Sequence, residues 1–466
     1  MRRRCLLTVR IVFYYLVLCA TAADILHLGA TRADSTSNKF ARHDPERVSV
    51  SIGDVSELGL YPRPERRHFS VLNIVALSFN ICNSWSTIAS SLAIAISAGG
   101  PATLIYGILL SVTAYSATAA SLAELASCYP TAGGQYHFTS ILAPKRFSRG
   151  LSYACGSIAT FSWIAIDAAA TLLGAQMLLS IISFYLPSYV PEAWHYFLVY
   201  QAIHLVLFLY NLVALVKTPW VHNLGLLLTL CAFVVITITC LARSEKRSSE
   251  YVWATLDNNT GWPSGVTFLT GLATPAFMYA GLDASMHLAE ECTEPEKTVP
   301  RALMATILIG FITGFAFSIA ILMHASLGVP VWALIVEEVV VIICGCIYLG
   351  STAAFNALIN TAVILQIISF AIPCALLLLR GRSERFLAKG RWFCIPGWLG
   401  WVCNGIVVVY AVIELVFFDL PTSIPTTGSS MNYTCAVLAT MAVFSGINWL
   451  VYARKHYKGP RIDLSS

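Results

Sequence analysis

The residues best suited to chemistry in this chain lie inside long apolar stretches or at their edges. Asp283, His287 and Glu290 follow one another at spacings of four and three residues, which places them on one face of a helix. Such a group can serve coupling or gating, or it can close the helix end through ion pairs with Lys297 and Arg301. The spacing of the histidine and the glutamates matches no zinc motif, so we expect no metal site.

Two further carboxylates stand where charge is costly. Asp167 lies in the middle of the apolar stretch 150–183, and Glu124 lies near the end of the stretch 101–126. A carboxylate within a bilayer is a functional candidate by default, because it ionises there only when it is paired or hydrated. For Asp167, a role in binding a proton or a substrate amine competes with a structural contact to a neighbouring polar group.

Two apolar stretches are interrupted in a way that a simple membrane helix would not tolerate. The run FNICNSW at residues 79–85 contains Asn80, Asn83 and Ser84, and the run TPAFMYAG at residues 274–281 contains a proline and ends on a glycine. Taken alone, the first could be a polar contact between helices and the second a kink. Because they occupy corresponding places about 200 residues apart, they predict two unwound helices that face each other across a solute site.

Composition excludes a soluble protein. The chain is 57% hydrophobic and 11% charged, with a mean hydropathy of +0.71, whereas soluble domains are about 45–50% apolar and about 25% charged. The net charge of +5 is not gathered into a basic face, which argues against a nucleic-acid partner. The 14 cysteines are scattered without metal-binding spacing, and the long apolar runs exclude a β-barrel. The composition therefore predicts an all-α polytopic membrane protein.

Eleven stretches after residue 70 are long and apolar enough to cross a bilayer, which takes about 20 residues. They cover residues 71–98, 101–126, 150–183, 195–216, 221–242, 264–290, 303–323, 331–349, 352–379, 396–419 and 433–452. We divide the chain into a polar tail (26–70), a first repeat of five spans (71–242), an incomplete second repeat (264–379), two C-terminal spans (396–452) and a cytoplasmic tail (453–466).

Residues 1–25 differ from the polar tail that follows them. A basic start precedes an apolar stretch, which is typical of a signal peptide or signal anchor. An amphipathic segment or an erroneous start is the alternative.

The distribution of lysine and arginine assigns the linkers to sides, because cytoplasmic linkers carry more of them. Counted from the N-terminus, linker 324–330 falls outside. Counted from the C-terminus, where the basic linker 380–395 and the tail are inside, linker 324–330 falls inside. Linker 243–263 breaks the rule with three basic residues but carries an N-glycosylation pattern at Asn258, which favours the outside. The two counts differ by one crossing between residues 303 and 331, so one span is missing there.

Four stretches of the sequence resemble a known family. They are FNICNSW with the following AGGP (79–85 and 98–101), AELASCYPTAGGQY (123–136), YAGLDASMHLAEE (279–291) and RKHYKGP (454–460). In this order, within residues 55–461, they resemble fungal permeases of the amino acid–polyamine–organocation superfamily, closest to the branch that carries GABA and choline.

The resemblance implies twelve helices, the first ten in two inverted five-helix repeats, with substrate at the broken first and sixth helices. The starts of half-helices there can hold a carboxylate, and Phe277, Tyr279 or Trp163 can face an ammonium. Glu124 matches a structural and gating position at the cytoplasmic end of the second helix. The implied substrate-binding residues are Asn80, Ile81, Cys82, Asn83, Ser84, Thr274, Phe277, Tyr279, Ala280 and Gly281.

One departure from the family coincides with the missing crossing. Residues 321–326 run directly into 327–330, which resemble the start of the ninth helix, so the eighth helix is absent and about eleven spans remain. The resemblance suggests a gap of about 80 residues. In relatives with a sodium site the eighth helix supports ion coupling, so its loss puts folding and transport in doubt.

We predict a secondary active transporter of the plasma membrane without a cofactor. It moves amino acids or related small amines, such as GABA or choline, by alternating access, with H⁺ as the coupling ion. The alternative is a non-transporting or inactive relative, because one helix is missing. An enzyme is not expected, since the sequence carries no nucleotide loop and no paired histidine-rich motif.

Overall fold

The computed structural model describes residues 69–186, 188–213, 220–242, 246–323, 352–421, 423–426 and 431–460. These residues all belong to one compact unit, 56–465. Their regular elements are helices, accompanied by two isolated bridges. The predicted N-terminal segment 1–25, most of the tail 26–70 and the predicted span 331–349 lie outside the described residues.

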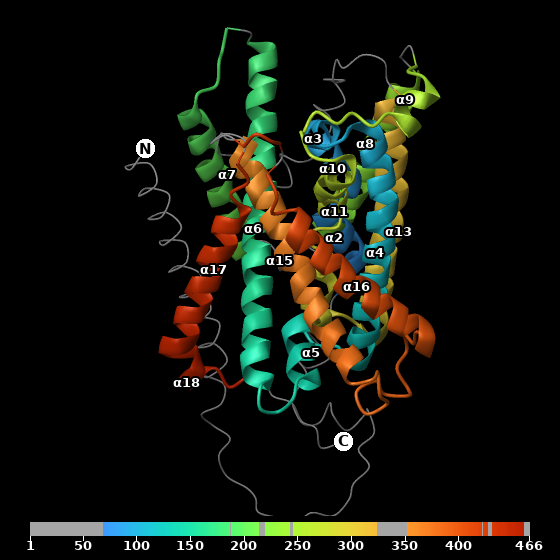
Figure 1. Cartoon of the computed structure of the whole chain (residues 1–466), viewed down its shortest axis with the longest axis vertical. Coiled ribbons are helices and arrows are strands. Elements are labelled where there is room, and N and C mark those ends of the chain that lie inside the picture. Colours follow the sequence, from blue (N-terminus) through green and yellow to red (C-terminus); the bar gives the residue numbers. More distant parts are fainter. Residues whose placement is uncertain are drawn as a thin grey trace, which may run out of the picture. The chain divides into compact units, whose positions relative to one another are not determined.

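Long apolar helices make up most of the described chain (Figure 1). Eight of those described are long and apolar enough to cross a membrane, which confirms the predicted all-α polytopic fold. The predicted span 195–216 corresponds to a shorter apolar helix, Trp194–Leu209. That shorter helix is part of α7 (Ala193–Val213). One of the eight spans is the divided helix Val71–Leu92. The other seven lie in α4 (Gly100–Cys128), α6 (Ser148–Tyr185), α8 (Trp220–Ala242), α13 (Pro295–Leu322), α15 (Thr352–Leu379), α16 (Gly397–Phe417) and α17 (Thr434–Asn448), which continues through η5 (Trp449–Ala453) into α18 (Arg454–His456).

The first predicted interruption divides one span into α2 (Val71–Cys82) and α3 (Ser84–Ser97). The break is narrow. Asn83 alone adopts the left-handed conformation, with φ 33° and ψ 57°, and its N–H closes α2 on the carbonyl of Phe79. Asparagine tolerates this conformation better than other non-glycine residues. The prediction that Asn80, Ile81 and Cys82 are unwound is therefore wrong, because these three residues remain helical.

The second interruption is wider and lies further along the chain than predicted. Helices α10 (Ser264–Gly271) and α11 (Ala273–Phe277) are followed by residues 278–283, where the helix is lost, and then by α12 (Ala284–His287) and the short turn η4 (Ala289–Glu291). Pro275 does not unwind the chain, because it lies in the first turn of α11, where backbone N–H groups have no helical partner. Gly281, with φ 87°, lies within the unwound part instead.

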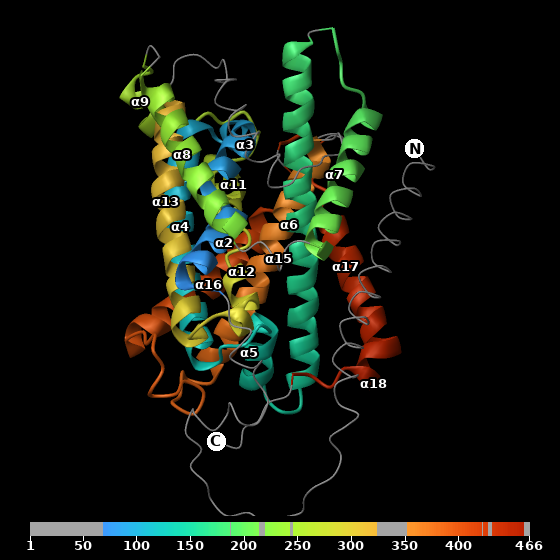
Figure 2. The ribbon, with the colours of Figure 1, turned by 180° about the vertical axis from the view of Figure 1, so that it is seen from behind.

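Helix α13 packs against α4, α2, α3 and α8, and α15 packs against α6, α16 and α5 (α5 is Gly134–Leu142). Helix α16 also contacts α4 and so links the two groups. Figure 2 shows α2, α4, α8 and α13 together, with α6, α7 and α17 on the other flank. The broken helices lie where these groups meet, because α11 contacts α3, α4 and α15.

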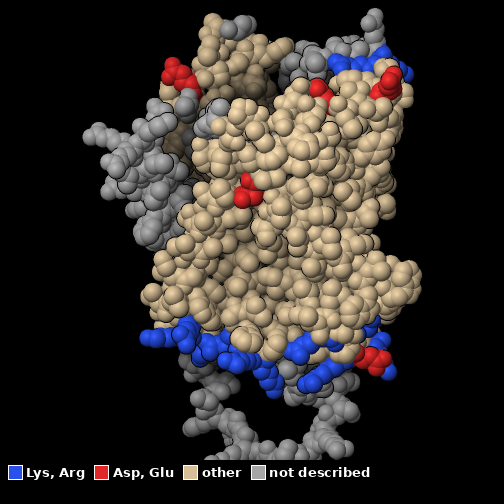
Figure 3. All heavy atoms as spheres, viewed as in Figure 1, with Lys and Arg blue, Asp and Glu red and all other residues tan. Residues whose placement is uncertain are grey.

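Charged side chains gather at the ends of the helices. Figure 3 shows lysine and arginine in a band at the lower end, where α5, α18 and the linker after α15 lie. The positive-inside rule assigns this end to the cytoplasm. The opposite end carries α9 (Ser249–Ala254) and the linker that precedes α10.

The chain enters and leaves the undescribed residues 324–351 at the same end of the bundle. Met323 accepts a hydrogen bond from the N–H of Arg247, in the linker that carries α9. The first turns of α15 contact the linker after α16, because Asn360 donates to the carbonyl of Phe418. That linker is joined to the α9 linker, since Trp262 donates to the carbonyl of Pro421.

Candidate functional site

The two helix breaks touch each other. The Ser84 hydroxyl, at the start of α3, donates a 2.8 Å hydrogen bond to the carbonyl of Met278, the first residue of the unwound stretch. Ile81 packs against Gly281, so closely that a Cβ atom at residue 281 would collide with its side chain. The unwound stretch therefore lies directly against the only described non-helical residue between α2 and α3.

The asparagines that marked the first interruption face α8 rather than the second break. Asn80 donates to the carbonyl of His222 at 2.7 Å. Asn83 accepts from the hydroxyl of Thr229 at 3.0 Å. Cys82 is buried between them. These side chains satisfy their polar groups against α8, while Ser84 and Ile81 meet the unwound stretch.

The residues predicted for the second break divide between helix and unwound backbone. Thr274 and Phe277 are helical and buried in α11. Tyr279, Ala280 and Gly281 belong to the unwound stretch and are also buried. The Tyr279 ring lies 5.1 Å from the ring of Tyr115, measured between centroids.

Asp283 lies at the centre of a buried polar cluster. Its side chain is 1% exposed, and its Oδ2 accepts hydrogen bonds from Gln135 and from the indole N–H of Trp163, the latter at 3.2 Å. Its Oδ1 accepts from Nε2 of Gln366 at 3.0 Å. The same Gln366 accepts through Oε1 from the N–H of Gly281, which fixes the orientation of its amide. Donors from α5, α6 and α15 thus converge on one carboxylate, an arrangement that favours its ionised form.

His287 completes this cluster from one turn further along. Its Nδ1 lies 3.0 Å from the carbonyl oxygen of Ala132, and its Nε2 lies 3.2 Å from Oδ2 of Asp283. A carbonyl oxygen only accepts, so Nδ1 must carry a hydrogen. Because Oδ2 already accepts two hydrogen bonds, the proton between the two side chains sits best on Nε2. The geometry describes an imidazolium–carboxylate pair that holds one exchangeable proton.

Sequence reasoning did not select Gln135 and Gln366 as site residues. Gln135 lies in the AELASCYPTAGGQY motif, and Gln366 is an isolated amide within the apolar span 352–379. The second could have been found, because a lone amide in a membrane helix needs a polar partner.

Glu290 does not join the Asp283–His287 pair. Its carboxylate accepts from the N–H of Ala132 at 3.2 Å. The predicted ion pairs of this cluster with Lys297 and Arg301 are wrong. Lys297 pairs with Glu294, three residues before it in the same turn, and Arg301 lies over the ring of Trp392.

Glu124 lies fully buried near the cytoplasmic end of α4. Its carboxylate pairs with Arg382 and Arg391, the second at 2.8 Å, and accepts from the N–H of Ile395 at 3.2 Å. Both arginines belong to the linker between α15 and α16. This double ion pair ties that linker to α4 and so joins the two groups of helices.

Asp167 lies on α6, one helical turn beyond Trp163. It faces His204 of α7 at 3.8 Å, and its side chain is 58% exposed. No contact between Asp167 and the Asp283 cluster is found among the described residues.

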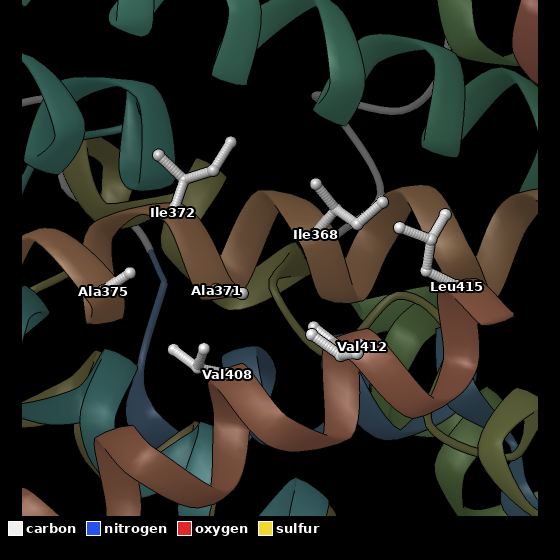
Figure 4. A pocket seen from close by; sticks show the side chains of 8 residues that line it. Ile368, Ala371, Ile372, Ala375, Val408, Val412 and Leu415 are labelled. Carbon is white, nitrogen blue, oxygen red and sulfur yellow. The ribbon is translucent and has the colours of Figure 1, made fainter.

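An apolar groove between α15 and α16 is lined by Ile368, Ala371, Ile372, Ala375, Val408, Ala411, Val412 and Leu415 (Figure 4). Its lining offers no polar side chain to an amine or a carboxylate. Within the described ranges, no group of three or more His, Cys, Asp and Glu side chains is arranged to hold a metal.

Comparison with known proteins adds an independent line of evidence. Residues 69–331 and 323–442 match the sequence profile of a family described as amino acid permease. The match comes in two pieces that meet at residues 323–331, where the charge counts place the missing crossing.

Individual relatives agree. The chain is 28% identical to a choline transporter of Saccharomyces cerevisiae, covering 84% of this chain and 82% of that protein. It is 24% identical to amino-acid permease 2 of Neurospora crassa, covering 91% and 92%. A solved manganese transporter of Eremococcus coleocola covers 90% of this chain and 98% of its own at 12% identity, but its TM-score of 0.38 carries no argument.

The alignments also contain a gap in this chain. The alignment with the choline transporter spans 473 positions, whereas 84% of these 466 residues is about 391, which leaves about 80 positions without a residue of this chain. For the Neurospora permease, 515 positions against 91% of the chain leave about 90.

Proposed function

Because this chain belongs to the amino acid permease family, we propose that it is a secondary active transporter of an amino acid or a related small amine, such as GABA or choline. It works at the plasma membrane by alternating access and is not an enzyme. The observation that carries the proposal is the contact between the two helix breaks, Ser84 with Met278 and Ile81 with Gly281. Backbone that is free of helical bonds at membrane depth is what a transported solute can use.

The substrate occupies the seam between the breaks. Helix α3 begins at Ser84 without a side-chain cap, so its N-terminus can receive the carboxylate of an amino acid. Trp163 is the aromatic residue for an ammonium group, because it is partly exposed while Phe277 and Tyr279 are buried. The substrate-binding set remains Asn80, Ile81, Cys82, Asn83, Ser84, Thr274, Phe277, Tyr279, Ala280 and Gly281.

Protons are the coupling ion, and the Asp283–His287 pair carries them. Loss of the proton between these side chains would leave a net negative charge in a buried cluster. When the pair holds its proton the cluster carries no net charge, so substrate can bind beside Trp163 while the proton is bound and both are carried in the same direction. Glu290, Glu124 and Asp167 are assigned to gating or coupling around this centre.

Uptake in yeast cells that lack their own amine permeases tests this function. Cells that express the full chain should accumulate labelled choline, GABA or an amino acid faster from acidic medium, and a protonophore should abolish the accumulation. Surface labelling must confirm that the protein reaches the plasma membrane. Absence of uptake for all of these solutes in cells with surface-exposed protein would contradict the proposal.

A second candidate, a non-transporting relative, is favoured by one observation. About 80 positions of the relatives have no counterpart here, and the family match is interrupted at 323–331. Met323 and the first turns of α15 lie at the same end of the bundle. Sequencing the transcript across residues 318–335 distinguishes the transporter from the non-transporting relative. A recovered segment of about 80 residues restores the transporter, whereas a continuous reading favours this second candidate.

A further inference from the structure

A second buried acid lies on α16, away from the Asp283–His287 pair. Glu414 is fully buried within a helix that is apolar and long enough to span the membrane. Within the described part of the chain, no lysine, arginine or histidine forms an ion pair with it. An unpaired carboxylate in such surroundings is stable only in its neutral, protonated form.

Hydroxyl groups from two helices surround this carboxyl. Tyr115 of α4 donates to its Oε1 at 3.5 Å, and the hydroxyl of Tyr410, one turn before it on α16, also contacts it. Ser111 of α4 in turn lies 3.0 Å from the Tyr410 hydroxyl. Ser111 contacts Tyr410, and Tyr115 contacts Glu414 one turn further along both helices. We call these two contacts between α4 and α16 the polar ladder.

The ladder reaches the unwound stretch through aromatic rings. The Tyr115 ring lies 5.1 Å from that of Tyr279 and 5.9 Å from that of Tyr410. Tyr279 belongs to residues 278–283 and packs against Gly310 of α13. A movement of the unwound stretch must therefore displace Tyr115, which is the partner of Glu414.

Among the described residues, one buried polar atom of Glu414 and one of Tyr279 have no hydrogen-bond partner. They are Oε2 of Glu414 and the hydroxyl oxygen of Tyr279. A ladder that served only to join two helices would satisfy its polar atoms. Both atoms can gain a hydrogen-bond partner if the stretch that carries Tyr279 moves.

No other titratable group competes for this position in the elements that pack against α16. These elements are α4, α15 and α10. Helix α10 contains no titratable residue, and α15 contains only Cys374, which lies near Cys403 towards the start of α16. Helix α4 contributes Tyr115. Its Tyr106 is exposed, and its Cys128 lies at the cytoplasmic end near Glu124, which is paired with arginines there.

We propose that Glu414 is a second proton-binding site, neutral in the closed arrangement and deprotonated when the Tyr279 stretch moves. The proton leaves the carboxyl oxygen for water that enters as Tyr279 and Tyr115 separate from it, and it returns by the same route. The inference rests on the proposed transport function, because it assigns a second proton to each cycle in addition to that of the Asp283–His287 pair.

The experiment has two parts on the purified full chain. Infrared difference spectroscopy between acidic and alkaline buffer should contain the carbonyl band of a protonated carboxylic acid, and Glu414→Gln should remove one such band. In proteoliposomes, the number of protons moved per labelled choline should fall by one in Glu414→Gln. Tyr115→Phe, which keeps the ring, should shift the pH at which the band disappears.

Asp419→Asn is the matched control, since Asp419 is a partly buried acid just after the end of α16, five residues beyond Glu414. It should remove only its own carboxyl band, leaving the band that Glu414→Gln removes and the number of protons per choline unchanged. A band and a proton ratio that are unchanged in Glu414→Gln would overturn the proton site, even if choline is transported. Absence of choline flux in the unaltered chain would count against the transport function, while the infrared band would still decide about Glu414.

Discussion

The Ser84 hydroxyl and the Met278 carbonyl, 194 residues apart in sequence, are joined by a hydrogen bond of 2.8 Å. This bond connects the two points at which membrane helices are interrupted. It also satisfies a backbone carbonyl that the loss of helix after α11 would leave without a partner. The two breaks therefore support each other.

Ser84→Ala tests this mutual support. A buried hydrogen bond contributes about 0.5–1.5 kcal/mol, and its removal leaves the Met278 carbonyl unpaired. We expect a small drop in the melting temperature of the purified protein and a larger loss of choline or GABA uptake. Ser90→Ala on the same helix is the control, because Ser90 bonds only to the carbonyl of Thr87 in its own turn. Equal effects of the two substitutions would contradict the assignment.

Gly281→Ala should be far more harmful than an ordinary glycine replacement. The φ of 87° lies in the left-handed region, which costs a residue with a Cβ about 1–2 kcal/mol, and the new methyl group would collide with Ile81. Adding Ile81→Ala should recover the steric part of the loss and leave the backbone part. Thermal unfolding of the two variants separates the contributions. Identical melting temperatures would mean that Ile81 does not press on residue 281.

His287→Gln should destabilise the protein by about 3–5 kcal/mol, because it leaves the buried Asp283 carboxylate without its partner. Asp283→Asn should cost less, because the His287 side chain is 33% exposed and can lose its proton. The double variant should lose less than the sum of the two, since it removes both charges together. Thermal unfolding measures the coupling. Uptake by the double variant should lose the part of its acid stimulation that this pair supplies, and an acid stimulation equal to that of the unaltered chain would exclude the pair as a proton carrier.

Glu124→Gln should weaken the cytoplasmic end of the bundle. Both guanidinium groups, Arg382 and Arg391, would lose their buried anion, a change that costs about 3–5 kcal/mol. We expect proteolysis to cut the linker between α15 and α16 much faster in this variant. Glu384→Gln removes an exposed ion pair with Lys389 in the same linker and should leave the cleavage rate unchanged. Similar cleavage rates for Glu124→Gln and Glu384→Gln would argue that the ion pairs of Glu124 do not hold this linker in place.

Much of the fold follows from the sequence, because long apolar stretches leave few alternatives to membrane helices. The approximate positions of both interruptions were also predictable, since Asn80, Asn83 and Ser84 are costly in lipid and Gly281 favours a left-handed turn. The breaks were predicted to face each other across a solute site, and the structure joins them directly through the bond between Ser84 and Met278. The roles of the individual site residues remain predictions.

The details that could not be predicted depend on partners from distant segments. Asn80 and Asn83 marked a break, yet both side chains turn to α8, and nothing in their local sequence names that partner. Pro275 was interpreted as a breaker, but its effect depends on where the helix starts. The ring of donors around Asp283 comes from α5, α6 and α15, so only the packing of three helices reveals it.

The amide of Gln366 has a consequence for any shortened form of this protein. It holds the N–H of Gly281 with one end and the carboxylate of Asp283 with the other, from a helix that comes after the interruption in the family match. A fragment ending at residue 323 would keep both halves of each divided helix but lose Gln366, and with it the two hydrogen bonds that fix Gly281 and Asp283. Co-expressing residues 1–323 with the remainder of the chain would show whether a separate polypeptide can supply the hydrogen bonds of Gln366.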